Sequence, residues 1–143
     1  MREKALSYLA AHNVMTLATK SVWAAAVFYA SEGFDLYFVS SPRSRHARDL
    51  AEDPRVAAAI HEDYRDWRAI RGIQLSGTAE RLGGAARAAA LACYRQKFPF
   101  LEIETTLLEV LGKIACYRVM PTEMHFLDNN LGFGARARVH LSR

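Results

Sequence analysis

The stretch Phe34–Arg48, which reads FDLYFVSSPRSRHAR, decides how this chain is interpreted. Its first six residues are typical of a β-strand, and a helical pattern follows that ends near Asp53. Serine, arginine and histidine side chains therefore gather where a strand is followed by a helix N-terminus. Backbone N–H groups lack partners there, the helix dipole favours negative charge, and an arginine fork fits a phosphate. The stretch predicts a phosphate-binding site.

A plainer interpretation of the same residues stays open. Short basic runs are often solvated surface, and Ser44 is also a good helix N-cap, with Arg48 and Asp49 then on the exposed side. Neither a Gly-x-Gly-x-x-Gly motif nor a lysine-bearing phosphate loop occurs in the sequence. The rest of the chain has to decide between the two interpretations.

Composition predicts one globular domain, residues 1–143, with 51% hydrophobic residues. The net charge is +4 (19 − 15), which suits an anionic small ligand, and no nucleic-acid partner is expected. Cys93 and Cys116 fall in apolar runs and are expected to be small buried side chains. No signal peptide or membrane-spanning segment is recognisable, so we expect a cytoplasmic protein without a membrane partner.

The periodicity of apolar residues predicts short strands with helices between them. The expected helices cover residues 3–12, 45–53 and 83–97, with a short helical turn at 106–111. The expected strands cover residues 14–19, 22–29, 34–39, 55–61, 70–80, 113–119 and 123–127, and residues 128–134 are expected to form a loop. Such an order favours a small closed or nearly closed β-barrel.

Several of these segments, taken in order, resemble the pyridoxamine 5′-phosphate oxidase-like split-barrel flavoproteins. The resemblance rests on NVMTLAT at 13–19, AAAVFY at 24–29, SRH at 44–46, DPRV at 53–56 and GTAERL at 77–82. The ending MHFLDNNLGFG, residues 124–134, is similar to a narrower subgroup, the uncharacterised YhbP-like proteins.

The resemblance implies a mainly β fold with flanking helices, a six-stranded split β-barrel of the FMN-binding type. It also implies a homodimer with FMN in a groove at the dimer interface. In this family a Ser-Arg-Lys run binds the flavin phosphate, and here it stands as Ser44, Arg45 and His46. Ser40 stands where the family often has a threonine that also contacts the phosphate. Backbone amides along one strand commonly face the isoalloxazine edge, and the matching residues are Ala25, Ala26, Val27 and Phe28.

The sequence also departs from the oxidases themselves. Ala25 and Ala30 stand where they carry an arginine and a lysine, and Gly72 stands near an expected glutamine. His46 replaces a lysine, so Arg45 is the firm cation with His46 assisting. The longer C-terminal extension of the oxidases is absent as well. We therefore do not expect pyridoxine-phosphate oxidase activity.

The segment Asn129–Gly134 has two open interpretations. Asn130 is a candidate flavin contact if the loop of one subunit caps the flavin of its partner. The alternative is a simple turn, because Asn and Gly tolerate positive φ. Trp23, Tyr64 and Trp67 either shape a substrate pocket or are core and interface residues.

The sequence therefore predicts an FMN-dependent oxidoreductase that acts on a small organic molecule with electrons from a nicotinamide donor. No catalytic residue and no metal site is predicted, because the flavin carries the chemistry. A non-catalytic flavin- or ligand-binding module is the alternative. A haem-binding split barrel, with His61 or His125 as axial ligand, and a deazaflavin in place of FMN also stay open.

Overall fold

The computed structural model describes residues 1–99, 107 and 112–142. Within them, one antiparallel sheet has the strand order β2-β1-β5-β6-β7-β4-β3, and β8 pairs with β7. The helical turn expected at 106–111 falls on residues outside the described part, apart from Leu107. The elements, in chain order, are α1 (Arg2–Ala11), β1 (Val14–Thr19), β2 (Trp23–Phe28), β3 (Ala30–Glu32), β4 (Asp35–Ser40), α2 (Arg45–Glu52), β5 (Arg55–His61), η1 (Trp67–Ala69), β6 (Arg71–Arg81), α3 (Gly84–Lys97), β7 (Ala115–Asp128), η3 (Asn129–Leu131) and β8 (Arg136–Arg138).

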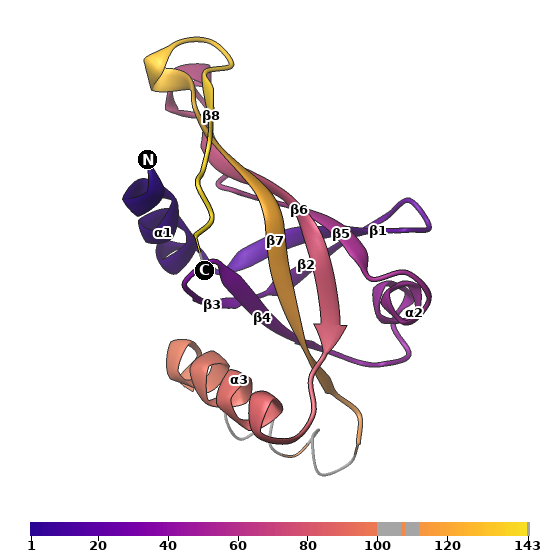
Figure 1. The fold of residues 1–143 in the computed structure, drawn as a ribbon. Coiled ribbons are helices and arrows are strands. Elements are labelled where there is room, and N and C mark those ends of the chain that lie inside the picture. The colour runs from indigo at the N-terminus through magenta and orange to yellow at the C-terminus, as the bar shows by residue number, and fades with distance from the viewer. Residues whose placement is uncertain (100–106, 108–111, 143) are drawn as a thin grey trace.

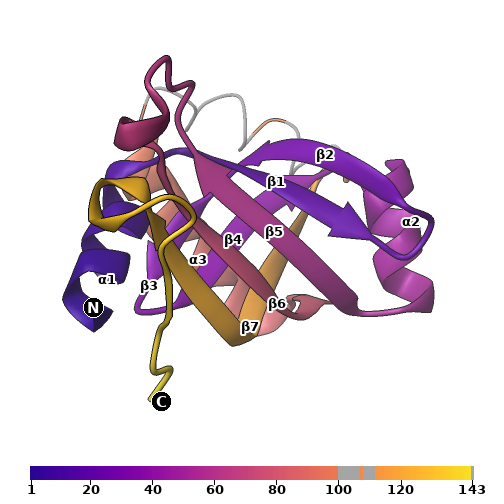
Figure 2. The ribbon, with the colours of Figure 1, turned by 90° about the horizontal axis from the view of Figure 1, so that it is seen from above.

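The sheet curls into a split barrel, as Figures 1 and 2 show. The strand β2, at one edge of the sheet, and the strand β4 contact each other but form no hydrogen-bonded ladder. The barrel is therefore open between these two strands. The helix α2 packs against the β1–β2 hairpin, while α3 packs against β3, β4 and β7. These contacts confirm a mainly β fold with flanking helices. No helix in the described residues is long and apolar enough to cross a membrane.

The core lies inside the curl of the sheet. In β1 and β5 every second side chain is buried, which is the period of a strand with one face on a core. Met15, Leu17, Phe38 and Ile60 are fully buried there. On the other face, small side chains stand in the middle of these strands, namely Thr16 and Ala18 in β1 and Ala57 and Ala59 in β5.

The number of strands differs from expectation, because eight strands occur in the described residues where the resemblance implies six. The strand expected at 22–29 ends at Phe28, and the chain then enters β3. Tyr29, between the two, is fully buried and its hydroxyl donates to Leu9 O at 2.7 Å. Residues beyond the expected loop add the short β8, and Asn129–Leu131 form a 3-10 turn.

The two strands expected at 113–119 and 123–127 are one long strand, β7, so that prediction is wrong. Gly77 pairs with Pro121 and Ser76 with Glu123, so Thr122 is an extra residue in β7 and the ladder continues past Pro121. Gly77 makes this bulge possible, because a Cβ there would lie 2.2 Å from Met120 O. With this bulge, β6 and β7 stay paired from Arg71 and Asp128 to Arg81 and Tyr117.

Candidate functional site

The N-terminus of α2 is closed by Ser44, which is its N-cap. The Ser44 hydroxyl donates to Ser41 O at 2.8 Å and accepts from the Ala47 N–H at 3.3 Å. The N-cap interpretation of Ser44 is therefore confirmed. The N–H groups of the first turn that the cap does not use remain an anion-binding feature.

His46 is buried beside the core ring of Phe38, with 6.2 Å between the ring centroids. Its Nε2 lies 2.6 Å from Ser40 Oγ and 3.3 Å from Ser44 Oγ. Burial lowers the pKa of His46 below its usual value near 6.5, only partly countered by the charge of Asp49. The lowered pKa favours a neutral His46 that bonds Ser40, so in this structure Arg45 is the cation at the start of α2.

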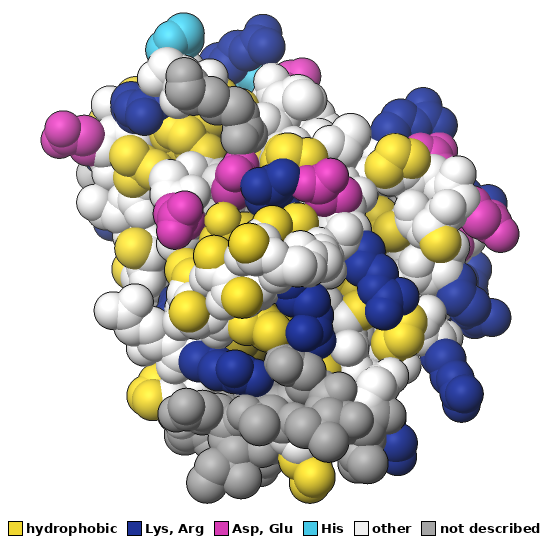
Figure 3. Space-filling view, turned by 60° about the horizontal axis from the view of Figure 1, so that its bottom comes forward, with side chains coloured by type: hydrophobic (Ala, Val, Ile, Leu, Met, Phe, Trp, Pro, Cys, Tyr) yellow, Lys and Arg dark blue, Asp and Glu magenta, His cyan; other side chains and the backbone are white. Residues whose placement is uncertain are grey.

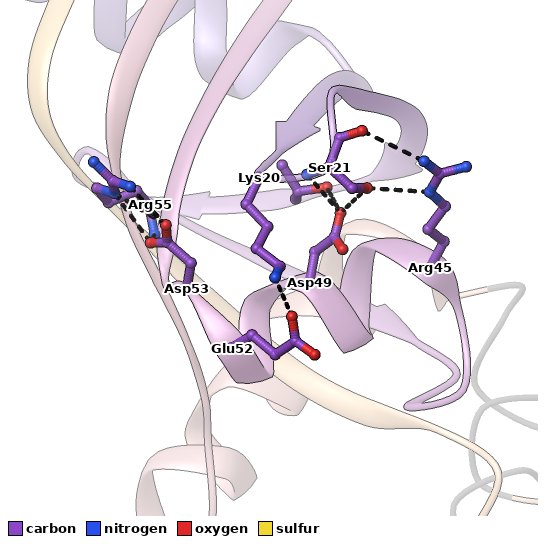
Figure 4. A network of polar contacts seen from close by, with 8 residues as sticks. Lys20, Ser21, Arg45, Asp49, Glu52, Asp53 and Arg55 are labelled. Carbon is purple, nitrogen blue, oxygen red and sulfur yellow. Dashed lines mark hydrogen bonds and ion pairs between the residues drawn. The ribbon is translucent and has the colours of Figure 1, made fainter.

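Arg45 extends toward the β1–β2 hairpin, as Figure 4 shows. Its Nε donates to Ser21 Oγ at 3.1 Å and its guanidinium also donates to Ser21 O at 3.4 Å. The guanidinium carbon lies 4.4 Å from the centre of the Trp23 ring, a cation–π distance. These contacts use one edge of the guanidinium and leave the edge formed by its two terminal nitrogens able to bind an anion bidentately.

Asp49 fixes the hairpin under Arg45 (Figure 4). Its Oδ2 accepts hydrogen bonds from Thr19 Oγ1 at 2.7 Å, from Ser21 Oγ at 2.6 Å and from Ser21 N at 3.3 Å. The bonds from Ser21 and then Thr19 lower the pKa of Asp49, which stays ionised. The hairpin needs this support because Val22 has a φ of +58°, which is strained for a β-branched residue.

The plainer interpretation of the sequence puts Asp49 on the exposed side of its helix, and the structure differs, because Asp49 is buried. It is buried because His46, Asp49 and Leu50 recur at helical spacing and share the inward face of α2. The hydrogen bonds to Thr19 and Ser21 cross about 30 residues of sequence, so no local pattern indicates them. This network is the part of the site that the sequence did not predict.

Ion pairs surround the network. Lys20 pairs with Glu52, and Arg55 pairs with Asp53 at 2.7 Å (Figure 4). Hydrogen bonds from Arg55 lower the pKa of Asp53 to about 2. Basic side chains also gather on the right-hand side of Figure 3, the side on which α2 lies in Figure 1. The surface around α2 is thus suited to an anion.

The strand β2 is the edge of the sheet next to this hairpin and pairs with β1 alone among the described elements. The Tyr29 N–H donates to Asn13 O, and antiparallel pairing alternates, so Val27 and Ala25 also point their N–H and C=O groups toward β1. Ala26 and Phe28 then point theirs toward the open edge. Both residues are solvent-exposed, and Phe28 is 48% exposed.

The aromatic candidates do not form one pocket. Trp23 lies under Arg45, the Tyr64 hydroxyl lies 3.3 Å from that of Tyr8, and Trp67 meets Phe133 edge to face at 5.7 Å. Of the two histidines considered for haem, His61 is exposed and its Nδ1 lies 3.1 Å from Glu62 O. His125 is half-buried, and its Nε2 lies 2.6 Å from a carboxylate oxygen of Glu123.

The segment η3, which contains Asn130 and follows β7, lies at the end of the sheet opposite to α2, the helix that begins at Arg45 (Figures 1 and 2), so one chain does not bring the two together. The Asn130 N–H donates to Asp128 Oδ1 at 3.0 Å, and Asn129 accepts from the Gly134 N–H at 3.0 Å. The loop thus forms a turn with positive φ at Gly132 and Gly134, and a contact of Asn130 with the flavin of a partner subunit stays a prediction. At Gly72, near the position where the resemblance implies a glutamine, a Cβ would come within 2.8 Å of Ile60 O.

Residues 1–127 match the family described as pyridoxamine 5′-phosphate oxidase. The chain is 31% identical over 134 residues to the UPF0306 protein plu4501 of Photorhabdus laumondii, covering 90% of this chain and 88% of that protein. It is 27% identical over 137 residues to the UPF0306 protein YhbP of Escherichia coli O157:H7, covering 90% and 86%.

Among solved structures, a heme binding protein from Mycobacterium smegmatis superposes with a TM-score of 0.80 at 26% identity. The match covers 96% of this chain but 57% of that one, so the chain spans little more than half of that protein. The split barrel, the matched residues and the 31% identical relative agree with the resemblance found in the sequence. The chain belongs to the pyridoxamine 5′-phosphate oxidase family and, among its members, to the UPF0306 proteins.

Proposed function

We propose that the protein binds FMN, with the phosphate at the N-terminus of α2 and the isoalloxazine along the free edge of β2. The observation that carries the proposal is the position of Arg45, whose guanidinium is held over the first residue of an edge strand. A fixed cation and a row of unpaired backbone amides thus occur side by side. FMN needs both, one for each end of the molecule.

The donor set fits a phosphate. Arg45 offers the free edge of its fork, Ser40 offers a hydroxyl group, and the first turn of α2 offers backbone N–H groups, while the Ser44 proton is donated to Ser41 O. A neutral His46 holds Ser40 in place instead of adding charge. One strong cation with several neutral donors predicts moderate affinity for the phosphate.

The edge of β2 fits the flavin ring. From Trp23 to Ala26 the strand advances about 10 Å at ~3.3 Å per residue, a span that the ribityl chain of FMN can cover. The exposed N–H and C=O groups of Ala26 and Phe28 match the alternating donors and acceptors on the pyrimidine side of the ring. The small side chain of Ala26 lets the ring approach the backbone.

A bound flavin would supply hydride and electron transfer, so the chain needs to hold the ring, exclude water and admit a substrate. We infer an oxidoreductase that acts on a small organic molecule with electrons from a nicotinamide donor. We further propose a homodimer, in which the partner subunit covers the exposed ring face. We do not expect pyridoxine-phosphate oxidation from this chain, because Ala25 and Ala30 stand where the oxidases carry basic residues.

Haem is the second candidate ligand, because the Mycobacterium smegmatis protein that superposes on this chain is a heme binding protein at 26% identity. His61 is the better axial candidate of the two histidines. Its Nδ1 faces a backbone carbonyl, while the Nε2 of His125 is already engaged by Glu123. A haem complex would then depend on His61 rather than on Arg45.

The test is a titration of the full chain with FMN and, separately, with riboflavin, followed by flavin fluorescence. Arg45→Ala is expected to weaken FMN binding by about 1.5–3 kcal/mol, the cost of a lost charge-assisted contact, and to leave riboflavin binding unchanged. Arg48→Ala is the matched control, because Arg48 is an exposed arginine of the same helix. Equal FMN affinity for wild type and Arg45→Ala would overturn the phosphate assignment.

Turnover and haem are tested on the same preparations. Reduction of bound flavin by NADH or NADPH, with transfer to an added acceptor, supports an enzyme; binding without reduction supports the non-catalytic module. A Soret band after haem addition that His61→Ala removes and Arg45→Ala retains would favour the haem alternative.

A further inference from the structure

A cavity of about 650 Å³ lies between α1, the start of β6, the end of β7 and η3. Its volume is in the usual range for sites of small organic ligands, ~300–1,000 Å³. These elements lie at the end of the sheet opposite to α2 (Figure 1). Within one chain the cavity is therefore separate from the proposed flavin site. Asn130, which one chain does not bring together with Arg45, lines this cavity.

Three rings, those of Tyr8, His12 and Phe126, form part of the wall of the cavity. The Tyr8 ring meets Phe126 edge to face, with 5.6 Å between centroids, and stacks on His12 at 3.8 Å. The Tyr8 hydroxyl donates to Arg71 O at 3.1 Å, which fixes the ring. Leu131 lines the rim and is 66% exposed. Such walls accept a flat apolar group.

Hydrogen-bond donors from three elements face this space. Lys4 and Ser7 on α1 and the side-chain amide of Asn130 in η3 have no hydrogen-bond or ion-pair partner among the described residues. Arg71 lines the cavity from β6, and its Nε lies 3.7 Å from Asp128 Oδ1, longer than a hydrogen bond. The N–H groups of Arg71 remain available as well.

The acceptors of the cavity are fewer. Asp128 already accepts the Asn130 N–H at 3.0 Å and balances the charge of Arg71. Glu3 is the other acidic residue of the lining. It directly precedes Lys4 in α1, and because adjacent residues of a helix do not face each other, Glu3 is not placed to pair with Lys4. The uncommitted groups are thus mainly donors, and they favour a ligand rich in acceptors.

We propose that this cavity binds a small aromatic carboxylic acid. The ring lies against Tyr8 and Phe126, and the carboxylate accepts hydrogen bonds from Lys4 and Arg71. The inference does not rest on flavin binding, because it uses other residues at the other end of the sheet.

The experiment is isothermal titration calorimetry of the full chain with 2-naphthoate, with the uncharged 2-naphthylmethanol as matched ligand. Lys4→Gln keeps a good helix former at an exposed position and removes the charge. It is expected to weaken 2-naphthoate binding at least tenfold and to leave 2-naphthylmethanol binding unchanged. Lys113→Gln, an exposed lysine outside the lining, is the control and is expected to bind as wild type does.

Arg71→Gln provides a second variant, with its melting temperature measured beside that of the wild type because Arg71 also neighbours Asp128. Equal 2-naphthoate affinity for wild type and Lys4→Gln, or no binding at millimolar ligand, overturns the proposal. Arg45→Ala should still bind 2-naphthoate, and Lys4→Gln should still bind FMN if the wild type does. Displacement of 2-naphthoate by FMN would place both ligands in one site and also overturn it.

Discussion

Ser21 determines where the Arg45 guanidinium lies. Its hydroxyl has one proton, which it donates to Asp49 at 2.6 Å, so its lone pair is left to accept from Arg45 Nε at 3.1 Å. The buried carboxylate thereby orients an arginine that it does not touch. Ser21 is a positioning residue for the proposed phosphate contact.

We expect Ser21→Ala to weaken FMN binding about three- to tenfold, the effect of one lost hydrogen bond, and to leave riboflavin binding unchanged. Ser21→Thr keeps the hydroxyl and should restore the FMN affinity, which a general loss of hairpin structure would not allow. Flavin fluorescence titrations of the three proteins check this. An equal loss of FMN and riboflavin binding would show that Ser21 acts on the fold instead.

His46 gives the protein a pH dependence of stability. Burial lowers its pKa in the folded state below the ordinary value near 6.5, so the unfolded chain binds more protons once the pH falls below 6.5. The contribution of His46 to the free energy of unfolding is complete above pH 6.5 and is lost as the pH falls toward the lowered value. Urea unfolding at pH 8 and pH 5.5 should show a smaller loss for His46→Gln than for wild type. An identical loss would mean that other groups cause the dependence.

The residue scale also shows what the sequence could predict of the site. Ser44 was expected as an N-cap because capping depends on its immediate neighbours, and it is one. The contact of Arg45 with Ser21 joins residues 24 apart, and the burial of His46 depends on Phe38 across the strand–helix turn. Local patterns predict which residues gather near α2, but the direction of each side chain depends on the packing of the hairpin.

Among the elements, β2 carries the most direct test of the ring position. The N–H of Ala26 points to the open edge, so Ala26→Pro removes it without removing a ladder hydrogen bond. We expect this variant to weaken FMN and riboflavin binding together, with little loss of stability. Ala25→Pro is the matched control, because the Ala25 N–H faces β1 and its loss should lower the melting temperature. If Ala26→Pro binds both flavins as tightly as the wild type does, the proposed position of the isoalloxazine ring along this edge is contradicted.

Element boundaries were predictable where one face of a strand is buried. The alternation of burial in β1 and β5 gave their limits, Val14–Thr19 and Arg55–His61, as expected from the sequence. The continuity of β7 was not predictable, because Pro121 normally interrupts a strand. The strand continues because Thr122 is an extra residue of β7 opposite Ser76 and Gly77 of β6, and such pairing between distant segments leaves no local signal.

Gly77 is therefore expected to be sensitive to substitution. Gly77→Ala places a Cβ against the backbone of Met120 and Pro121, which cannot move without breaking the β6–β7 ladder. Overpacking of this kind costs about 1–3 kcal/mol of unfolding free energy, measurable by urea denaturation. Gly83→Ser is the control, because Gly83 has open space and caps α3, where serine is favoured. Equal stability of the two variants would contradict the role given to the bulge.

At the scale of the whole molecule, the outer face of β1 and β2 exposes apolar side chains. Val14 and Phe28, cross-strand partners on this face, are 42% and 48% exposed. Beside them a row of alanines runs across three strands, from Ala24 through Ala18 to Ala57. A second copy of the chain placed on this face would cover the apolar residues and the open edge of β2 at once.

If the proposed homodimer uses this face, a charge in the alanine row should separate the subunits. Ala57→Glu places one carboxylate on each copy, and two-fold symmetry buries both without a partner. We expect the dissociation constant to rise about a hundredfold or more, seen by light scattering coupled to size exclusion, while the far-ultraviolet circular dichroism is unchanged. Gln96→Glu, an exposed position on α3, should remain a dimer. FMN binding by Ala57→Glu should weaken as the dimer dissociates, because each subunit then lacks the partner that covers the ring. Full FMN affinity in a monomeric Ala57→Glu would show that one chain binds the flavin without a partner.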